Sequence, residues 1–246
     1  MKLAIMQPYF FPYIGYFQLI NHVDEFILYE DIKHIKKGWV NKNRIYEINK
    51  GIINITVPLK KHKSDELISN INIDNFQNWN TKILNSIFFN YKKTNHFEEI
   101  YPHFEEMLKF KSERISTINY DTLNKICKLL NIKTKIRLSN KEFIDIENKL
   151  LDYNQTLFNI ETKTKRILDI CKKGDYSTYI NPIGGKLIYN KETFKENGIE
   201  LGFVETKSFV YPQNSHNFIP NLSIIDVLFN CGVQETKLIL NYFSLV

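Results

Sequence analysis

The sequence lacks the cysteine spacing of a disulfide framework or of a structural zinc site. Its three cysteines, Cys127, Cys171 and Cys231, lie far apart, and none belongs to a CxxC pair. Because they fall on apolar faces of predicted helices, we expect buried, unreactive thiols. The 246-residue chain has no apolar run of the roughly 20 residues that a membrane-spanning helix needs. Its first residues show no signal-peptide pattern, so we expect a cytoplasmic protein.

Several catalytic and cofactor motifs are also absent. There is no GxSxG nucleophile elbow, no HExxH metal motif, no GxGxxG turn for a nicotinamide cofactor and no GxxxxGK[ST] phosphate loop. The six histidines are scattered along the chain. We therefore expect no metal site, and the common serine-hydrolase and dinucleotide-binding patterns are excluded.

The chain carries an excess of positive charge. Lysine and arginine number 33 against 27 acidic residues, a net charge of +6, which favours anionic partners such as nucleotides, nucleotide-linked substrates or nucleic acid. The composition offers another explanation, because Lys, Asn and Ile are abundant and Ala4 is the only alanine. An AT-rich coding background raises lysine regardless of function. Local clusters are therefore more informative than the total charge.

Strand-like and helix-like segments alternate along the chain. Short apolar segments predict strands at 3–6, 25–29, 44–48, 52–57, 67–73, 132–138, 179–181 and 199–204. Amphipathic segments predict helices at 16–22, 76–91, 97–110, 117–130, 162–173, 191–197, 223–229 and 235–243. The first strand, helix and strand occupy about 30 residues, the length of a βαβ unit with parallel strands. We predict a single α/β domain over residues 1–246, with a Rossmann-like, mainly parallel sheet and a helical insertion at about 76–130.

The densest feature of the sequence is MQPYFFPYIGYFQL, which begins at Met6. It lies between a predicted strand and a predicted helix, where parallel α/β sheets bind their ligands. A glycine there would let the backbone approach a ligand closely. One interpretation is an aromatic plug that closes one end of the sheet. The other is a ligand pocket, and it predicts substrate contacts for Gln7, Pro8, Tyr9, Tyr13, Gly15 and Tyr16.

Two basic segments follow predicted strands. The first is DIKHIKKGWVNKNR at 31–44, and the second is PLKKHK at 58–63. Lysine and arginine can hold phosphates, and a tryptophan can stack on a base or a sugar ring. These segments are either solvated loops or a pyrophosphate-binding rim at one end of the sheet. The rim interpretation predicts substrate contacts for Lys37, Trp39, Asn41, Arg44, Lys60 and Lys61.

Asp31 and His34 are the candidates for proton transfer in the first basic segment. An amine nucleophile must lose a proton, and a carboxylate or an imidazole within hydrogen-bond reach can accept it. The alternative is that Asp31 simply pairs with a neighbouring lysine.

Three later segments contain further candidates. Residues 181–186 (NPIGGK) form a predicted turn whose glycine amides could hold an anion, although a tight turn alone also explains the two glycines. The loop FVYPQNSHNFIP suits a lid, and Asp226 on the following helix is either a hydrogen-bonded core residue or a ligand contact. The predicted substrate contacts are Asn181, Gly184, Gly185, Tyr189, His216 and Asp226.

Long stretches of the chain resemble the WbqC-like protein family. They are MQPYFFPYIGYFQLI, VDEFILYEDIKHIKKGWVNKNRI and ITVPLKK, followed by YINPIGGKLIY and LSIIDVLFNCG. The similarity covers essentially the whole chain, and the N-terminal motif is highly specific. Members are typically encoded in gene clusters for O-antigen and other surface polysaccharides. The resemblance implies modification of a sugar nucleotide, by acylation or aminoacylation of an amino sugar.

A second, looser resemblance concerns the start of the first predicted helix. A strand, a Pro-containing loop and x-Ile-Gly-x resemble the "HIGH" region of adenylyltransferases and class I synthetases, whose two histidines contact ATP phosphates. Here Tyr13 and Tyr16 occupy the histidine positions. A phenol donates a hydrogen bond but lacks the positive charge of an imidazolium. The resemblance therefore implies the scaffold, with an already activated donor such as an aminoacyl-tRNA or an acyl thioester.

The sequence thus predicts an acyltransferase or aminoacyltransferase that acts on the amine of a nucleotide-linked amino sugar. The sequence assigns no certain cofactor, and the candidates are an activated donor, such as an aminoacyl-tRNA or an acyl thioester, or ATP. One alternative is an ATP-dependent ligase or nucleotidyltransferase. The other is a non-catalytic module that binds tRNA or another nucleic acid. The sequence specifies no oligomeric state.

Overall fold

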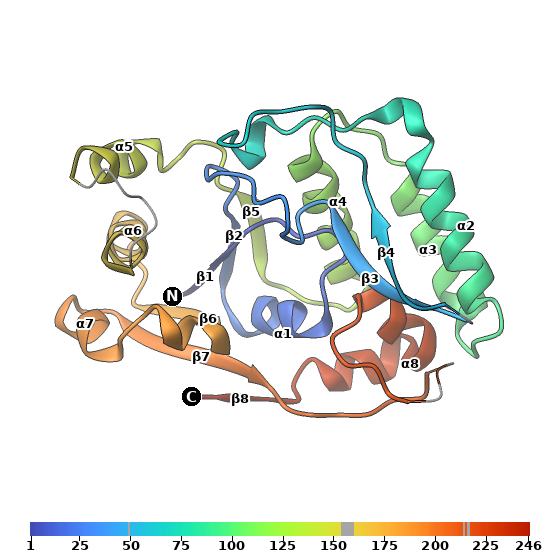
Figure 1. Ribbon diagram of the computed structural model, residues 1–246. Helices are drawn as coiled ribbons and strands as arrows, with labels where there is room; N and C mark the ends of the chain where they lie inside the picture. Colours follow the sequence, from blue (N-terminus) through green and yellow to red (C-terminus); the bar gives the residue numbers. More distant parts are fainter. Residues whose placement is uncertain (49, 154–159, 214, 216) are drawn as a thin grey trace.

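The computed structural model describes the whole chain except residues 49, 154–159, 214 and 216 (Figure 1). Its centre is a six-stranded sheet with the strand order β5-β2-β1-β6-β7-β8. The strands are β1 (Lys2–Met6), β2 (Glu25–Leu28), β5 (Lys135–Leu138), β6 (Thr178–Pro182), β7 (Glu200–Thr206) and β8 (Phe243–Leu245). The first five are parallel to their neighbours, and β8 runs antiparallel to β7. The expected mainly parallel α/β sheet is confirmed.

Helices cover both faces of this sheet (Figure 1). They are α1 (Ile14–His22), α2 (Trp79–Tyr91), α3 (Phe97–Lys109), α4 (Ile115–Leu129), α5 (Ile144–Tyr153), α6 (Ile160–Lys173), α7 (Lys191–Glu196) and α8 (Ile224–Ile239). Side chains alternate along each strand, so Ala4 belongs to the core under α1, α4 and α8, and Leu3 and Ile5 to the core under α5, α6 and α7. None of the described helices combines the length and the apolarity that crossing a membrane requires.

The connection from β2 to β5 contains the predicted insertion. Helices α2, α3 and α4 lie within it, together with a hairpin of β3 (Lys42–Glu47) and β4 (Gly51–Thr56), which forms a separate two-stranded sheet. Three short 3-10 helices complete the described structure: η1 (Ile68–Asn70), η2 (Asn75–Gln77) and η3 (Ile183–Leu187).

Two local predictions were wrong, and one helix was missed. The strand predicted at 67–73 is the turn η1 with isolated bridges, because its residues pair singly with different segments. The helix α5 was not predicted. The last predicted helix, 235–243, ends at Ile239 as part of α8, which kinks at Gly232 (φ 69°), and Phe243–Leu245 pairs with the edge strand β7.

The strand order reverses between β1 and β6. The chain leaves β1 toward β2 and β5, then returns on the other side of β1 to form β6 and β7. The loops after β1 and β6 therefore diverge to opposite faces of the sheet and leave a crevice between them. In open parallel sheets such a crevice at the carboxyl ends of the strands is where ligands bind.

Candidate functional site

Two cavities lie at this crevice and share the side chains of Met6, Tyr9 and Pro182. We call the first, of about 520 Å³, the aromatic chamber. Its other wall residues are Pro12, Tyr13, Trp39, Asn43, Arg44, Ile183, Val204, Glu205, Thr206 and Asn221.

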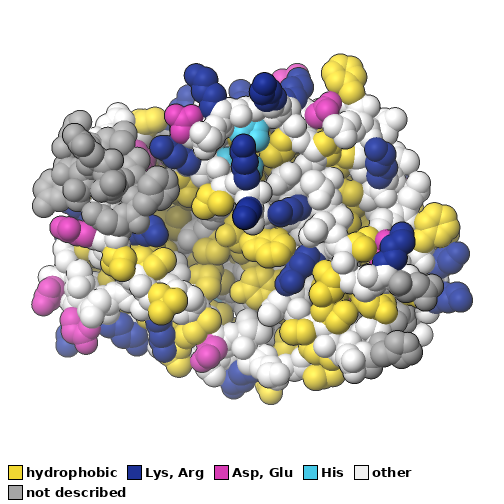
Figure 2. Space-filling view, viewed as in Figure 1, with side chains coloured by type: hydrophobic (Ala, Val, Ile, Leu, Met, Phe, Trp, Pro, Cys, Tyr) yellow, Lys and Arg dark blue, Asp and Glu magenta, His cyan; other side chains and the backbone are white. Residues whose placement is uncertain are grey.

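The second cavity, of about 390 Å³, is the polar chamber. Beyond the shared residues it is lined by Ile5, Gln7, Tyr29, Ile32, Lys163, Arg166, Ile167, Tyr179, Asn181, Gly184, Gly185, Ile188 and Tyr189. Both volumes lie in the range of about 300–1,000 Å³ that is typical of small-molecule sites. Figure 2 shows this face of the molecule hollowed, with hydrophobic side chains at the floor and Lys and Arg side chains along the rim.

Buried polar side chains hold the loop that joins β1 to α1. The Tyr16 hydroxyl donates to the carbonyl of Gln7 at 2.8 Å, and Asn119 Nδ2 donates to the carbonyl of Pro8 at 2.8 Å. A buried carbonyl left without its donor would cost about 1–3 kcal/mol. Tyr16, which we expected to contact substrate, is instead buried and supports the loop from within.

Two further side chains hold the next turn of this loop. Asn43 Nδ2 donates to the carbonyls of Phe10 and Phe11 at 3.0 and 2.9 Å, and Ser223 Oγ donates to Phe11 at 2.7 Å. Phe11 has a φ of 40°, in the left-handed region that bulky residues seldom adopt. The surrounding hydrogen bonds therefore hold a strained backbone in place, which makes the loop a preformed wall.

The loop is both an aromatic plug and a pocket wall. Phe10 and Phe11 are completely buried, whereas Tyr9 and Tyr13 are half-buried and line the aromatic chamber. Burial raises the pKa of both tyrosines. At neutral pH they are therefore uncharged groups that can stack on a ligand or donate a hydrogen bond to it.

Gly15 allows this wall to form. A Cβ at this position would lie 2.4 Å from Tyr13 Cε2 and 2.6 Å from Thr206 Oγ1. Both neighbours line the aromatic chamber, and Thr206 Oγ1 also donates to Gln18 Oε1 at 2.7 Å. We expected this glycine to let the backbone approach a ligand. In the structure it lets the side chains of Tyr13 and Thr206 pack closely against α1.

We predict that Gly15→Ala lowers the free energy of unfolding by about 1–3 kcal/mol, because the added methyl overpacks the site. It should also weaken any ligand of the aromatic chamber, since Tyr13 and Thr206 must move. Urea denaturation measures the first effect. Gly184→Ala is the control, because a Cβ there meets no atom within 4 Å. Equal stabilities of the two variants would contradict the prediction.

Arg44 is the only cation that the described part of the chain places on the wall of the aromatic chamber. Its Cζ lies 5.3 Å from the centroid of the Trp39 ring, and its Nη2 donates to the carbonyl of Asn221 at 3.3 Å. Its Nε is buried and has no partner among the described residues. The stacked guanidinium is therefore held in position with donors to spare, which suits an anionic ligand.

Of the residues that the structure describes, Glu205 is the only one with a carboxylate on the walls of either chamber. It lies near the carboxyl end of β7, and its side chain has no hydrogen bond or ion pair within the described part of the chain. A negative group here faces the same cavity as Arg44. The aromatic chamber can therefore receive a ligand that carries both a negative and a positive charge.

The polar chamber has a different charge arrangement. Arg166 Nε and Nη2 donate to the Glu147 carboxylate at 2.5 and 2.9 Å, and the Tyr29 hydroxyl donates to Glu147 at 2.5 Å. Burial opposes the charge of Arg166, but the pair with Glu147 outweighs it and raises the pKa of Arg166. Lys163 is the other cation on this wall. The chamber therefore offers a fixed guanidinium beside an ammonium group.

The glycine turn after β6 lines this chamber. Asn181, Gly184, Gly185 and Tyr189 all line it. A Cβ on Gly185 would lie 2.2 Å from Asn181 Oδ1, so this glycine is needed for packing. Asn181 Nδ2 donates to the Tyr179 hydroxyl at 2.6 Å, which fixes the amide at the wall.

Asp31 and His34, the expected proton-transfer residues, line neither chamber. Asp31 is 4% exposed, and its Oδ2 accepts from Ser139 Oγ at 2.7 Å and from the Lys141 amide at 2.9 Å. It thereby fixes the turn after β5. His34 is 6% exposed and contacts His62 through ring nitrogens 3.2 Å apart. Neither position brings these groups to the cavity walls.

The buried His34 should make stability depend on pH. Burial lowers its pKa, and the charges of His62 and Lys36 lower it further. The unfolded chain therefore binds the proton more readily, and the free energy of unfolding should fall as the pH drops below about 6.5, by at most about 1.4 kcal/mol per pH unit.

Urea denaturation at several pH values measures this dependence. His34→Asn should remove part of it, whereas His103→Asn, at a half-exposed position on α3, should not. The prediction fails if both variants keep the full dependence of the parent protein.

Several other predicted contacts lie away from the chambers. Pro8 is buried, Asn41 bonds the backbone of Val57, and His216 lies outside the described residues. The lysines of the predicted rim are exposed and line neither cavity: Lys37, Lys60 and Lys61.

Asp226 is a structural residue in this geometry. It is 1% exposed and accepts hydrogen bonds from Tyr91, Tyr211 and Gln213 at 2.8, 2.8 and 2.9 Å. Burial raises its pKa, although the three donors oppose the shift. These bonds attach Tyr211 and Gln213, which lie between β7 and α8, to α8. Of the two interpretations of Asp226, its position fits the hydrogen-bonded core residue.

The sequence interpretation missed Glu205, Asn221, Lys163 and Arg166. Glu205 near the end of a predicted strand was a usable signal, because that is the ligand edge of the sheet. Lys163 and Arg166 lie three apart on one helix face, a spacing that many solvated helices share. The described residues contain no group of three or more His, Cys, Asp or Glu that could hold a metal ion.

The three cysteines are buried as expected. Burial raises the pKa of each thiol to about 12. None lines either chamber. At neutral pH they are therefore protonated, which disfavours a role as nucleophile.

The chain is similar in sequence to known proteins. The model of the WbqC-like protein family matches residues 7–238. A Mycobacterium tuberculosis protein described as "Uncharacterized protein Rv1507c" is 31% identical over 236 residues, which cover 95% of each chain. No solved structure matches the chain significantly.

Proposed function

Because the chain belongs to the WbqC-like protein family, we propose that it transfers an acyl or aminoacyl group to the amine of a nucleotide-linked amino sugar. One observation carries this proposal. Among the described residues, the only charged side chains on the wall of the aromatic chamber are Arg44 and Glu205, and three aromatic rings accompany them. A nucleotide-linked amino sugar has the matching groups: an anionic diphosphate, a sugar ring with apolar faces, and an ammonium group.

The proposed placement follows the charges. The sugar lies in the aromatic chamber against Tyr9, Tyr13 and Trp39, with its diphosphate toward Arg44. The nucleoside extends past the residues that the two chambers share into the polar chamber. There the Asn181 amide and Lys163 can bind polar groups of the nucleoside. This placement keeps the substrate contacts that the sequence predicts for Trp39 and Arg44.

Glu205 is the proposed proton acceptor. It binds the ammonium group of the sugar and takes the proton that the amine gives up. The amine nitrogen then attacks the carbonyl carbon of an activated donor, for example a thioester. The amide C–N bond forms, the C–S bond breaks, and the thiolate leaves with a proton. An aminoacyl ester reacts in the same way, with a C–O bond broken and an alcohol released.

The test is a transfer assay with a panel of nucleotide-linked amino sugars and activated donors. We expect a product heavier than the acceptor by the acyl group, with the added group on nitrogen. The matching sugar nucleotide with a hydroxyl in place of the amine should not react. Absence both of binding to every amino-sugar nucleotide and of transfer would overturn the proposal.

ATP-dependent ligation is the second candidate, and one observation favours it. Tyr13 is the N-cap of α1 and lines the aromatic chamber, at the position where the resembling enzymes hold ATP phosphates. Release of pyrophosphate or AMP from ATP, dependent on the amino-sugar nucleotide, would establish ligation. Turnover with an activated donor and without ATP would show that the reaction does not require ATP.

A further inference from the structure

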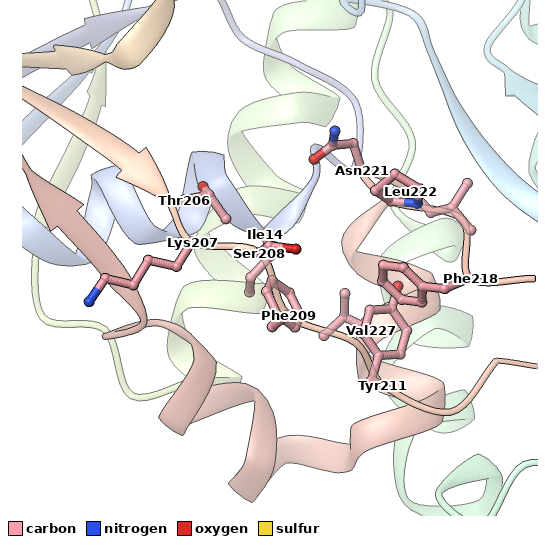
Figure 3. Close-up of a pocket in the computed structure, with 11 residues that line it drawn as sticks. Ile14, Thr206, Lys207, Ser208, Phe209, Tyr211, Phe218, Asn221, Leu222 and Val227 are labelled. Carbon is pink, nitrogen blue, oxygen red and sulfur yellow. The ribbon is translucent and has the colours of Figure 1, made fainter.

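A third cavity, of about 250 Å³, lies beside the aromatic chamber (Figure 3). Residues 207–211 and 218–222 of the connection from β7 to α8 supply much of its wall, and we call the cavity the strap pocket. Its apolar wall consists mainly of Ile14, Phe209, Tyr211, Phe218, Leu222 and Val227. Nothing in the proposed binding mode above occupies this space.

The strap pocket and the aromatic chamber share two wall residues, Thr206 and Asn221. Glu205 and Thr206 both line the aromatic chamber. A group in the strap pocket that reaches the shared residues would therefore end at the wall of the chamber that carries Glu205. An acyl group in this position would place its carbonyl carbon at the shared wall, in the chamber proposed to hold the amine.

Two polar side chains of the strap pocket, Thr206 and Tyr211, are engaged in hydrogen bonds, whereas those of Ser208 and Asn221 have none within the described part of the chain. Tyr211 donates its hydroxyl proton to Asp226 at 2.8 Å, and Thr206 donates to Gln18 at 2.7 Å. Lys207 Nζ lies 5.4 Å from the Tyr242 ring centroid, and Figure 3 shows this side chain directed away from the aromatic cluster. A nucleobase would need free donors and acceptors, whereas a hydrocarbon group would not.

The wall of the pocket is held in place before any ligand arrives. Gln213 donates to Asp226 at 2.9 Å and to the carbonyl of Ile219 at 3.0 Å, and accepts from the Ile219 amide at 2.8 Å. The rings of Tyr211 and Phe218 pack edge to face with centroids 5.1 Å apart. A preformed apolar cavity binds without the cost of ordering a loop.

We propose that the strap pocket is the subsite for the acyl group of the donor and that it selects a hydrocarbon-rich acyl group or aminoacyl side chain. This inference rests on the proposed function. For scale, an apolar cavity of about 150 Å³ accommodates benzene. The larger strap pocket therefore has room for an acyl group of about six to eight non-hydrogen atoms, well beyond acetyl.

The experiment has a binding arm and a turnover arm. The binding arm measures the affinity of straight-chain primary amides from acetamide to octanamide by ligand-observed NMR. The affinity should rise about fourfold with each methylene group until the pocket is full. The turnover arm measures kcat/KM for the matching acyl thioesters of N-acetylcysteamine with an amino-sugar nucleotide as acceptor.

Two variants change the pocket without touching the charged pair. Phe218→Ala enlarges it and should move the optimum to longer chains by about two carbons, while the acetyl donor changes less than about twofold. Ser208→Phe narrows it and should lower the affinity and kcat/KM of hexanoyl compounds by about tenfold or more. Val210→Ala is the control, because Val210 lies in the same segment, is 74% exposed and does not line the pocket.

The outcomes separate the two proposals. If the amides bind with the expected size dependence but no amine is acylated, the apolar pocket stands and the proposed function fails. If acylation occurs and its chain-length profile is the same in every variant, the acyl subsite is refuted and the function stands. Competition between hexanamide and a free nucleoside for the pocket would also overturn the inference.

Discussion

Arg44→Ala should lower the affinity for a nucleotide-linked amino sugar by about 100-fold. Hydrogen bonds to charged groups contribute about 1.5–3 kcal/mol each, and a guanidinium can make two of them to one phosphate. The side chain makes one bond of 3.3 Å to Asn221 and stacks on Trp39, so its removal should leave the fold intact. Isothermal titration with the amino-sugar nucleotide and with the free nucleoside diphosphate measures the effect.

Two further variants sharpen this result. Arg44→Lys keeps the charge but loses the planar fork, so we expect about a tenfold loss. Lys42→Ala removes a cation two residues earlier in β3 that lines neither chamber, and its affinity should match that of the parent protein. If Arg44→Ala binds the diphosphate as tightly as Lys42→Ala, the diphosphate does not lie at this wall.

Glu205→Gln should lower kcat for acyl transfer by about 100-fold to 10,000-fold, the usual contribution of a general base. The change is almost isosteric and removes only the negative charge. The variant should also lose its preference for an amino sugar over the matching hydroxyl or N-acetyl sugar, because it can no longer attract an ammonium group. The affinity for the nucleoside diphosphate alone should not change.

Glu200→Gln is the matched control, since Glu200 is an exposed residue at the opposite end of β7. It should retain both the rate and the preference. Glu205→Asp should recover part of the rate, because it keeps the carboxylate but shortens its reach. A Glu205→Gln enzyme with the parent rate would show that another group accepts the proton.

Asp31 and His34 illustrate why adjacency in the sequence was a poor guide to the site. They lie within a few residues of Trp39, which does line the aromatic chamber. The Asp31 carboxylate, however, is bonded by Ser139, 108 positions later in the chain. No local sequence pattern predicts a partner so far along the chain, so the burial of this carboxylate could not be foreseen.

The predicted contacts that line the chambers come from the aromatic loop, from the basic segment with Trp39 and Arg44, and from the turn after β6. Tyr9, Tyr13 and Gly15 come from a single aromatic loop whose prolines and glycine interrupt regular structure. Gly184 and Gly185 form a turn directly after a buried strand. In each case the residue types and their spacing carried the signal, because turn chemistry is a short-range property.

The amino-acid sequence by itself determined the alternation of strands and helices, the parallel sheet and the aromatic loop at its edge, since each follows from periodicity or turn residues within a short window. Tertiary structure alone decided that Lys163 and Glu205 face the cavities together with Arg44. Arg44, Lys163 and Glu205 come from three separate elements, and only the reversal of strand order between β1 and β6 brings the walls that carry them around one crevice. The carboxylate on the chamber wall is thus selected by chain topology, because many exposed glutamates have the same local sequence character.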